Sequence, residues 1–474
     1  MKHLKVPLLI LLVLSFQDGQ AQVTPQQMIS NMGRGINIGN ALSAPVEGNW
    51  APALTEDYFI DIEAAGFTTA RIPIDFFGVR TSGDTSGYSS ASGTLGAYSG
   101  STSDYVVSST YLDRIEQVIN WSLNHNLITI LDFHGSNLKT EFLYTHSPKS
   151  KWAAYYTEPT SAKRAADNDK FRAIWTTIAN RFKDYSYNLI FEVVNEPYFW
   201  LTDIEMDALN IDVISIIRNS GSKNTDRNII ITGGSKNSYE APLQISNTVL
   251  SSDNNLIATF HYYWPRAFTA SSGENDNDFD WGNNTDKLDI DTNFGAVKTW
   301  SQNNSIPILL GEFGADNEGG YNYATQTYGS FGGPENASRV AYHEYLAEKA
   351  IELGFAFAAW DAGDKSNKTI YKVSDRTWVD DVKNALLGSS LSMESYNFES
   401  LKVFPNPVTS KILNLKTSKR ITDVAIYNLK GSKIKIKSFK SNLIELPPLQ
   451  NGMYILKTVF NDGNFTNHKI LINQ

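Results

Sequence analysis

The chain has 474 residues, a formal net charge of −9 and no cysteine. This length suffices for one large domain and one smaller domain, and the apolar fraction of 41% is that of a globular protein. The negative charge argues against a nucleic-acid partner for the whole chain. The lack of cysteine excludes disulfides, thiolate zinc sites and a cysteine nucleophile.

The first 21 residues have the pattern of a secretory signal peptide. Lys2 and Lys5 supply a basic start, residues 6–16 form an apolar stretch, and Gly19-Gln-Ala21 offers a small-x-small cleavage site. The apolar stretch is too short to span a bilayer comfortably. We therefore expect residues 1–21 to be a signal peptide and the mature protein to be secreted or held at the cell surface.

Charge divides the rest of the chain into two modules. Residues 401–474 contain 12 Lys and Arg against 3 Asp and Glu, so this tail carries +9 and residues 1–400 carry −18. A Ser-rich stretch after Leu387 favours a linker. We expect one large domain over residues 22–388, a linker over 389–400 and a second domain over 401–474.

Within the large domain, short apolar runs alternate with longer amphipathic stretches, which is the pattern of βα units. The amphipathic stretches have apolar side chains at the spacing of one helix face and include residues 111–123, 169–182, 203–218 and 337–353. Eight runs have strand length: residues 35–41, 68–74, 127–133, 188–194, 228–232, 256–262, 306–313 and 355–360.

Eight strands with crossover helices predict a (β/α)8 TIM barrel with enlarged loops. A doubly wound open sheet is the alternative fold. It usually has fewer strands and carries a Gly-rich phosphate loop after the first of them. Residues 33–39 contain glycines, but they lack that spacing and lie within a predicted strand.

Three long segments follow predicted strand ends, the face on which a barrel builds its active site: residues 81–110, 264–293 and 315–336. They are rich in aromatic and amide side chains, among them Trp264 and Trp281. Such loops suit a sugar, because rings stack on its C–H faces while short polar side chains bond its hydroxyls. Loops that simply vary explain any single aromatic residue equally well.

Two predicted strands end in a lone glutamate. Asn195 and Glu196 follow the run 188–194, where Pro197 stops the strand, and Glu312 ends the run 306–313. Either acid alone fits a helix N-cap or a salt-bridged rim residue. Two acids at the same mouth of one barrel, however, form the arrangement of a glycoside hydrolase, in which two carboxyl groups flank the bond to be broken.

Other strand ends carry polar or aromatic groups as well: Arg71, His134, His261 with Tyr263, and Trp360. Chance would scatter such groups over both ends of the strands, so we expect one shared site. A guanidinium such as Arg71 favours an ionised nucleophile. Asn195 is placed to hold the sugar hydroxyl beside the reacting carbon, and Trp360 to form an apolar floor beneath the ring.

These motifs resemble glycoside hydrolase family 5, a family of retaining (β/α)8 glycosidases. The matches are Ala70-Arg-Ile-Pro73, Asp132-Phe-His134, Val194-Asn-Glu-Pro197, His261-Tyr-Tyr263, Gly311-Glu-Phe-Gly314 and Ala359-Trp-Asp361. They occur in family order and cover most of residues 30–385. The resemblance implies that Glu196 is the acid/base and Glu312 the nucleophile. It also implies that the subsite is shaped by Arg71, His134, Asn195, His261, Tyr263 and Trp360.

One position departs from the family pattern, since Gly135 follows His134 where many members have a second histidine. We expect this change to alter the wall of the cleft and not the mechanism. The resemblance implies a β-1,4-glucan of the cellulose or mixed-linkage type as substrate. An endo-β-mannanase or xyloglucanase on the same scaffold is the alternative, and a non-catalytic glycan-binding barrel is the alternative of another class.

No cofactor or metal is expected. A metal-dependent hydrolase built on His134 and His261 would need more ligands at metal spacing, such as His-x-His, and the sequence has none. The acidic run Asp276-x-Asp278-x-Asp280 hints at calcium but fails the EF-hand spacing. A solvated acidic loop is therefore the favoured interpretation of this run.

The tail after residue 400 has short alternating segments punctuated by Pro, Gly and Asn, which predict a small β-sandwich. Phe404-Pro-Asn-Pro407, Ile426-Tyr-Asn428 and Gly452-Met-Tyr-Ile455 resemble the C-terminal sorting domain of the type IX secretion system. A carbohydrate-binding module is the alternative, but the tail has no Trp. The expected partners are thus a polysaccharide substrate and the export machinery, with the chain acting as a monomer.

Overall fold

The computed structural model describes residues 22–76, 78–85, 88, 98–135, 162–197, 201–272, 278–328, 332–388, 401–417, 420–428, 432–440, 442–460 and 465–473. Contacts divide the chain into two compact units, residues 1–388 and 389–474. The predicted signal peptide and linker lie outside the described residues. Within the described residues, no helix is long and apolar enough to cross a membrane.

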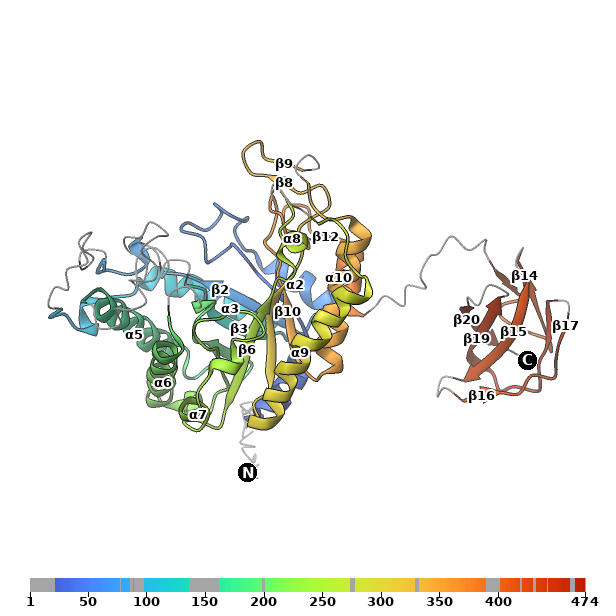
Figure 1. Cartoon of the computed structure of the whole chain (residues 1–474), viewed down its shortest axis with the longest axis horizontal. Helices are drawn as coiled ribbons and strands as arrows, with labels where there is room; N and C mark the ends of the chain where they lie inside the picture. The colour runs from blue at the N-terminus through green and yellow to red at the C-terminus, as the bar shows by residue number, and fades with distance from the viewer. Residues whose placement is uncertain are drawn as a thin grey trace, which may run out of the picture. The chain divides into compact units, whose positions relative to one another are not determined.

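The first unit is a closed barrel of eight parallel strands (Figure 1). The order around the barrel is β1-β10-β7-β6-β5-β4-β3-β2, and β1 pairs with both β10 and β2 to close it. This confirms the predicted TIM barrel, because each of the eight apolar runs holds one strand. The strands are β1 (Arg34–Asn37), β2 (Thr69–Ile74), β3 (Ile128–Phe133), β4 (Leu189–Glu192), β5 (Ile229–Ile231), β6 (Leu256–Tyr262), β7 (Ile308–Phe313) and β10 (Ala356–Ala359).

The strands are buried on both faces, as parallel strands under helices must be. In β4, for example, Leu189 and Phe191 belong to the large core under the helices, whereas Ile190 lies in a smaller cluster with Ile130 and Ile257. That smaller cluster also contains Met28, Ile29 and Met32 of α1 (Pro25–Met32). Helix α1 therefore packs against the strand layer that contains Ile128 and Ala356, near the beginnings of β3 and β10.

The helices lie outside the barrel and include all four predicted ones. Residues 284–293, expected to be part of a long loop, instead begin helix α9; Asn283 and Asp286 form a capping box there, a start signal that was overlooked. The helices are α2 (Glu56–Ala65), α3 (Ser109–Asn124), α5 (Ala162–Phe182), α6 (Asp203–Asn219), α7 (Asn247–Leu250), α8 (Arg266–Thr269), α9 (Asn284–Asn304), α10 (Asn336–Glu352) and α11 (Asp380–Leu387).

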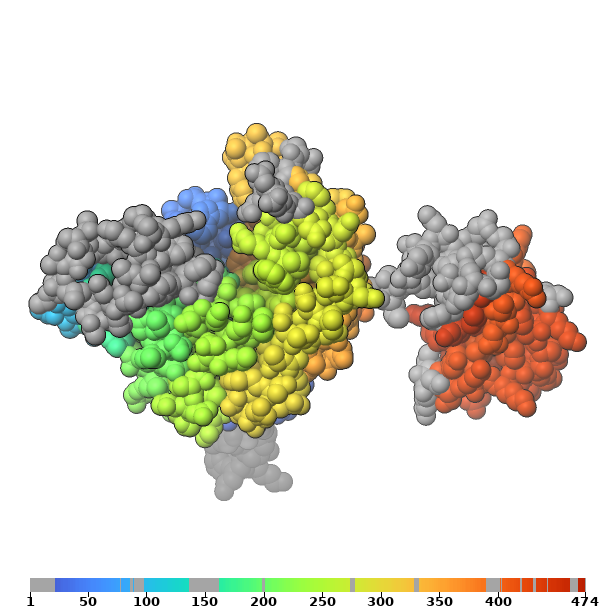
Figure 2. Space-filling model, viewed as in Figure 1, coloured from blue at the N-terminus to red at the C-terminus, as the bar shows by residue number. Residues whose placement is uncertain are grey.

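Two small hairpins rise from the loops that follow β7 and β10. One pairs β8 (Tyr321–Asn322) with β9 (Thr327–Tyr328), and the other pairs β11 (Tyr371–Lys372) with β12 (Thr377–Trp378). Figure 2 shows the β8–β9 segment standing above the rest of the barrel unit's surface. The segment 315–336, expected to be a plain loop, thus contains a hairpin of its own.

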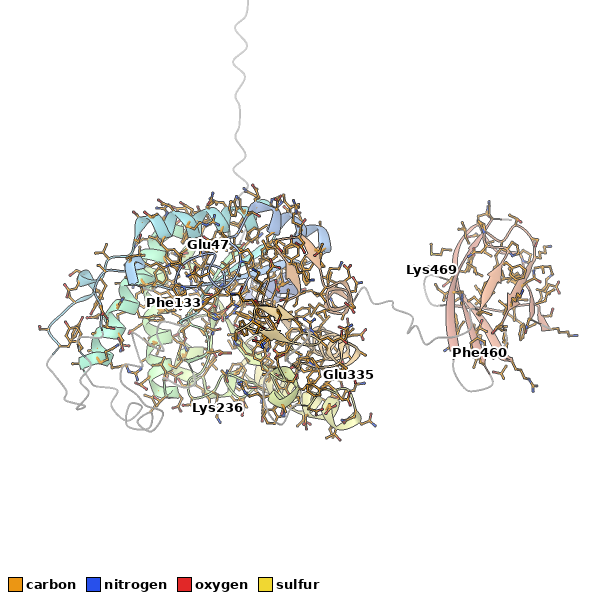
Figure 3. The ribbon with its side chains drawn as sticks, turned by 90° about the horizontal axis from the view of Figure 1, so that it is seen from above. Glu47, Phe133, Lys236, Glu335, Phe460 and Lys469 are labelled. Atoms are coloured by element: carbon orange, nitrogen blue, oxygen red, sulfur yellow. The ribbon has the colours of Figure 1, made fainter. Side chains whose placement is uncertain are left out.

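The second unit consists of two four-stranded antiparallel sheets around one core, as predicted for a β-sandwich. Its buried residues include Ile426, Leu456 and Phe460, the last labelled in Figure 3. The sheet orders are β13-β14-β18-β17 and β16-β15-β19-β20. The strands are β13 (Lys402–Phe404), β14 (Ile412–Lys416), β15 (Ile421–Asn428), β16 (Lys433–Ile434), β17 (Ser438–Lys440), β18 (Leu443–Glu445), β19 (Gly452–Phe460) and β20 (Phe465–Ile472).

Candidate active site

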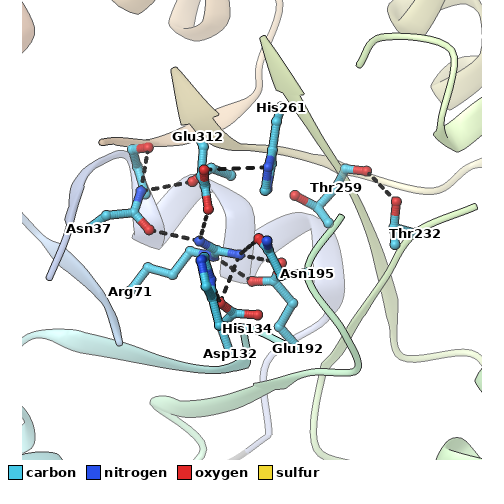
Figure 4. A network of polar contacts seen from close by, with 12 residues as sticks. Asn37, Arg71, Asp132, His134, Glu192, Asn195, Thr232, Thr259, His261 and Glu312 are labelled. Carbon is cyan, nitrogen blue, oxygen red and sulfur yellow. Dashed lines mark hydrogen bonds and ion pairs between the residues drawn. The ribbon is translucent and has the colours of Figure 1, made fainter. Parts of the chain in front are cut away.

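A buried arginine lies at the centre of the barrel mouth (Figure 4). Arg71 of β2 donates from Nε and Nη2 to the two carboxylate oxygens of Glu192, at 2.7 and 2.9 Å. Its Nη1 donates to Asn37 Oδ1 at 2.8 Å and to Glu312 Oε1 at 2.7 Å. Its Nη2 also donates to Asn195 Oδ1 at 2.9 Å. One side chain therefore ties together β1, β2, β4 and β7.

Asn195 is held by this network in a defined orientation. Its backbone N–H donates to Phe133 O at 2.9 Å, and its side-chain oxygen accepts from Arg71. With the oxygen bound to the guanidinium, the amide group of Asn195 must present its N–H2 side away from Arg71. Asn195 also lines the active cavity, which fits a donor to a sugar hydroxyl.

A bulge between β6 and β7 sets the position of Glu312. Phe260 pairs with Leu310, but the next residue, His261, pairs with Glu312, so Gly311 is skipped. A Cβ at Gly311 would lie 2.6 Å from Thr259 Oγ1 and 3.0 Å from His261 Nε2. The glycine therefore leaves room for the imidazole. The bulge makes His261 and Glu312 direct neighbours across the two strands.

The carboxylates of Glu196 and Glu312 both lie close to the ring of His261. The His261 Nδ1 atom lies 2.9 Å from Glu196 Oε1 and 3.6 Å from Glu312 Oε2. A carboxylate oxygen of Glu196, a ring nitrogen of His261 and a carboxylate oxygen of Glu312 all lie within 4.8 Å of one another. Glu196 has a positive φ of 27°, a backbone conformation that is uncommon outside glycine and clusters at functional sites.

Tyr263 and two stacked rings complete the cavity. The Tyr263 hydroxyl donates to Glu312 Oε2 at 2.9 Å, so both oxygens of Glu312 accept a hydrogen bond. The rings of His134 and Trp360 stack with centroids 5.6 Å apart and 13° between their planes. The cavity has a volume of about 500 Å³ and is lined by His134, Asn195, Glu196, Asn237, Ser238, His261, Tyr263, Trp264, Arg266, Thr269, Ala270, Glu312, Trp360 and Lys368.

The structure thus brings all eight predicted site residues together. Seven of them line the cavity, and Arg71 lies behind it, with no exposed surface, as the partner of Glu312. Three residues of this network were not predicted as site residues: Asn37, Asp132 and Glu192. Asn37 and Glu192 lie in predicted strands and are fully or almost fully buried. A polar side chain inside an apolar strand was the signal that could have identified them.

The other predicted loop aromatics divide into two groups. Trp264 is 56% exposed and lines the cavity, which agrees with the expectation for a sugar-binding ring. Trp281 instead packs edge-on against Tyr342, with centroids 5.2 Å apart, and is a core residue. In the acidic run, Asp278 and Asp280 are exposed, whereas Asp276 lies outside the described residues.

The network contains more acidic side chains than basic ones. Burial alone would lower the pKa of Arg71, but the negative charges of Asp132, Glu192 and Glu312 outweigh it and raise this pKa well above its usual value. Burial likewise opposes protonation of His261, yet Glu312 and the hydrogen bond to Glu196 raise its pKa. Arg71 therefore stays cationic, and His261 is favoured as a hydrogen-bond donor to Glu196.

Asp132 provides a test of this electrostatic arrangement. Burial raises its pKa from 3.8 to about 7 against the opposing effect of Arg71. Its Oδ2 lies 3.1 Å from Arg71 Nη2 and 2.9 Å from His134 Nδ1, whereas Oδ1 has no hydrogen-bond partner among the described residues. Between pH 4 and 7 the folded state therefore binds a proton that the unfolded state has lost, so this group's contribution to stability falls as pH rises.

We expect Asp132→Asn to flatten the decrease in the free energy of unfolding between pH 4.5 and 7.5. The two pKa values differ by about 3, which bounds the effect at about 4 kcal/mol. Urea unfolding of both proteins across this range measures it. A variant whose stability falls with pH as steeply as that of the wild type would contradict the raised pKa.

The same cluster offers ligand atoms for a metal ion. Glu196, His261 and Glu312 are the group with that geometry within the described parts of the chain. Each of the three is also engaged by a hydrogen bond within the network. These contacts suit a pair of catalytic carboxyl groups, which needs no ion.

Comparison with known proteins gives two family matches. The family described as Cellulase (glycosyl hydrolase family 5) matches residues 33–366, and the secretion system C-terminal sorting domain matches residues 402–473. Endoglucanase H of Acetivibrio thermocellus is 32% identical over 369 residues, which is 77% of this chain. The matched part is about a third (34%) of that relative's length. Endoglucanase B of Paenibacillus lautus is 27% identical, over 90% of this chain and 70% of its own length.

Solved structures agree with the family matches. Endoglucanase Cel5A of the hyperthermophilic Thermotoga maritima superposes with a TM-score of 0.58 at 27% identity, covering 77% of this chain and all of that one. Structures of the same enzyme in complex with cellobiose and with mannotriose match at TM-scores of 0.57 and 0.58 and 26% identity. They cover 76% of this chain and 99% of that one.

Proposed function

Because the chain belongs to glycosyl hydrolase family 5, we propose that it is a retaining endo-β-1,4-glucanase with Glu312 as nucleophile and Glu196 as acid/base. The observation that carries this proposal is the spacing of the two glutamates, whose nearer carboxylate oxygens lie within 4.8 Å. Retaining enzymes hold their carboxyl groups about 5–5.5 Å apart, whereas inverting ones leave about 6.5–9.5 Å for a water molecule.

In the first step Glu312 attacks the anomeric carbon while Glu196 gives its proton to the leaving oxygen. A bond forms between a Glu312 oxygen and the carbon, and the glycosidic C–O bond breaks. Arg71 and Tyr263 each donate to one oxygen of Glu312, which suits a carboxylate. Asn195 faces the cavity as a donor and is placed to bind the hydroxyl beside the reacting carbon.

In the second step water replaces Glu312 at the anomeric carbon. Glu196, now a carboxylate, takes a proton from this water, and the Glu312–sugar bond breaks with retention of configuration. His261 lies 2.9 Å from Glu196 and 3.6 Å from Glu312. A proton on its Nδ1 atom stabilises the carboxylate form of Glu196 between the two steps.

We expect Glu196→Ala to slow hydrolysis of substrates with poor leaving groups by roughly 10²–10⁴-fold, the usual contribution of a general acid. Aryl glycosides with good leaving groups need no protonation and should lose much less in the first step. Added azide should give a glycosyl azide of retained configuration, because it attacks the covalent intermediate without a base. Steady-state rates on both substrates and NMR of the product measure these effects. Equal losses on both substrates would contradict the role of Glu196.

The substrate class is tested by reducing-sugar release on carboxymethyl cellulose, barley β-glucan, mannan and xyloglucan, measured side by side. We expect the strongest release on a β-glucan, with the β-anomer formed first in ¹H NMR. An endo-β-mannanase is the second candidate, since a solved relative was crystallised with mannotriose. Binding to one polymer without release from any of the four would instead support a non-catalytic barrel.

The C-terminal unit indicates that the protein is exported. Residues 402–473 match a secretion system C-terminal sorting domain, which indicates a secreted or cell-surface protein. We propose that the export machinery is the partner of this unit and that the barrel acts as a monomer on polysaccharide outside the cell. The cleavable signal peptide stays a prediction.

A further inference from the structure

Lys368 is a cation of the active cavity that has no role in the two reaction steps described above. It lies on the loop after β10, and its side chain is 18% exposed. Its Nζ atom lies 2.5 Å from Asp316 Oδ1 and 5.8 Å from the centre of the Tyr263 ring. The hydroxyl of that ring donates to Glu312, the proposed nucleophile. One side chain therefore separates the lysine from the reacting carboxylate.

The acid that pairs with Lys368 is buried and held in place. Asp316, on the loop after β7, is 2% exposed, and its Oδ2 accepts from Ser272 N at 3.0 Å. Its Oδ1 accepts from Lys368 Nζ, so both carboxylate oxygens are engaged. Hydrogen bonds between ionised groups are stronger and more closely defined in geometry than neutral ones. The ammonium group of Lys368 is therefore held at one point of the cavity wall.

Backbone groups connect Asp316 to Tyr263 by a second route. Asp316 N donates to Thr269 O at 3.1 Å, and the Thr269 hydroxyl donates to Tyr263 O at 2.7 Å. Thr269 is the last residue of α8 and lines the active cavity. Tyr263, Thr269, Asp316 and Lys368 thus form a closed circle of contacts, which we call the Tyr263 clamp.

The main chain on both sides of Tyr263 is fixed as well. The hydroxyl of Tyr342, a fully buried residue of α10, lies 3.3 Å from Tyr262 O and 3.4 Å from Trp264 O. With the main chain fixed, the direction of the Tyr263 hydroxyl depends on rotation about the two side-chain bonds of this residue. Lys368 lies over the face of the ring and limits that rotation, because a cation is attracted to the π electrons of an aromatic face.

The position of the ring decides whether Glu312 keeps its second hydrogen-bond donor. Arg71 donates to Oε1 of Glu312, and Tyr263 donates to Oε2. Burial and the negative charges of Glu312 and Glu196 raise the pKa of Tyr263 well above its usual value, so its hydroxyl keeps the proton. A hydrogen bond weakens steeply once its distance or angle is lost. A small rotation of the ring would therefore release one oxygen of the nucleophile.

We propose that Asp316 and Lys368 are positioning residues, which hold the Tyr263 ring so that its hydroxyl keeps Glu312 oriented for attack. The inference rests on the proposed function, since it takes Glu312 as the nucleophile. Lys368 acts through Tyr263 and not through contact with the sugar. Its removal should therefore slow the chemical step and leave substrate binding nearly unchanged.

The first test is steady-state hydrolysis of an aryl cellobioside by the full-length chain and its variants. Tyr263→Phe removes a hydrogen bond to a charged group, which corresponds to a loss of roughly 10- to 100-fold in kcat. Lys368→Met leaves the hydroxyl present but misplaced, so we expect a loss of roughly tenfold in kcat, with KM changed by less than about twofold. Lys368→Arg keeps a cation that pairs with Asp316 and should keep most of kcat.

A double variant shows through which residue Lys368 acts. Lys368→Met combined with Tyr263→Phe should be as active as Tyr263→Phe alone, because the hydroxyl that the lysine positions is already absent. Losses that multiply would show that Lys368 acts on Glu312 directly. A higher KM at constant kcat would show that Lys368 binds the sugar. Either result would overturn the proposal.

A second variant protects the test against loss of folding. Lys368→Met leaves Asp316 buried without its counter-ion, which destabilises a folded protein. Lys368→Met combined with Asp316→Asn removes both charges and should show the same loss of kcat. A crystal structure of this variant reads the contact without turnover. We expect the Tyr263 hydroxyl to lie farther than about 3.5 Å from Glu312 Oε2, beyond hydrogen-bond distance.

The matched control is a second group of lysine, aspartate and tyrosine on helices α9 and α10. Lys349 Nζ lies 3.0 Å from Asp291 Oδ1 and 5.7 Å from the centre of the Tyr345 ring, and its side chain is also 18% exposed. None of these three residues lines the active cavity. Lys349→Met should therefore leave both kcat and KM unchanged.

Two failures are distinguishable. If the wild type hydrolyses neither the aryl cellobioside nor any of the polymers, the proposed function fails, and the crystal structure still reports whether the ion pair holds the Tyr263 ring. If the wild type is active while Lys368→Met and the variant without both charges keep its kcat and the contact of Tyr263 with Glu312, the Tyr263 clamp does not position the nucleophile.

Discussion

Replacing Glu312 by alanine is expected to reduce turnover by roughly 10⁴–10⁶-fold, the loss seen when a hydrolase nucleophile is removed. Glu312 ends a bulged strand, and both its oxygens accept hydrogen bonds, from Arg71 and Tyr263. No other carboxyl group among the described residues that line the cavity can take its place, since the one remaining acid, Glu196, is the proposed proton donor. The measurement is the initial rate on an aryl cellobioside.

Adding azide to Glu312→Ala shows which step of the reaction the variant has lost. In Glu312→Ala the small anion occupies the space left by the carboxylate and attacks the anomeric carbon directly while Glu196 protonates the leaving group. One displacement inverts the configuration, so the product should be the α-glycosyl azide, opposite to that expected for Glu196→Ala. A rate near that of the wild type, or a rescued product of retained configuration, would reverse or exclude the assignment of the two glutamates.

Removing the buried cation is expected to have the largest effect on stability. Arg71 is fully buried and contacts Asp132, Glu192 and Glu312. Arg71→Met keeps the length of the side chain but leaves these acids without their counter-ion. Loss of one partner from a buried ion pair costs about 3–5 kcal/mol. Urea unfolding at pH 7 should show a loss of this size, together with loss of activity.

The loss should depend on pH in a defined direction. Without the guanidinium, the pKa values of Asp132 and Glu192, which burial already raises, rise further. The folded variant then binds protons that the unfolded chain has released, so its deficit in stability grows between pH 5 and 8. A deficit that is constant over this range would show that the three acids do not depend on Arg71.

Arg181→Met is the matched control. Arg181 also pairs with two acids, Asp113 and Glu116, but its side chain is 35% exposed. Exposed pairs contribute about 0–1 kcal/mol because water screens them. If both variants lost the same stability, burial of the Arg71 network would not be the cause.

Much of the fold could be predicted from local pattern. The eight apolar runs correspond to the eight barrel strands, because a strand buried on both faces must be apolar along its whole length. The motifs around Glu196 and Glu312 were recognisable for a related reason. Each motif stands at the carboxyl end of such a run, where parallel strands bring their side chains together.

Other features depend on contacts between distant parts of the chain. Asn37 and Glu192 differ from their neighbours only as polar side chains in apolar strands, and the tertiary structure alone shows that Arg71 of another strand binds both. The bulge at Gly311 that turns His261 toward Glu312 is a property of two paired strands. Neither can be read from one segment, because hydrogen bonds between side chains far apart in sequence leave no local pattern.

The primary sequence was thus enough for the barrel and the sandwich, which follow from hydrophobic periodicity, and it singled out Glu196 and Glu312 as candidates through short motifs. The tertiary structure decided the rest: the burial of Trp281, the spacing of the two glutamates and the network around Arg71. These features depend on how separate strands and helices pack, and packing is set by contacts that no single stretch of sequence contains.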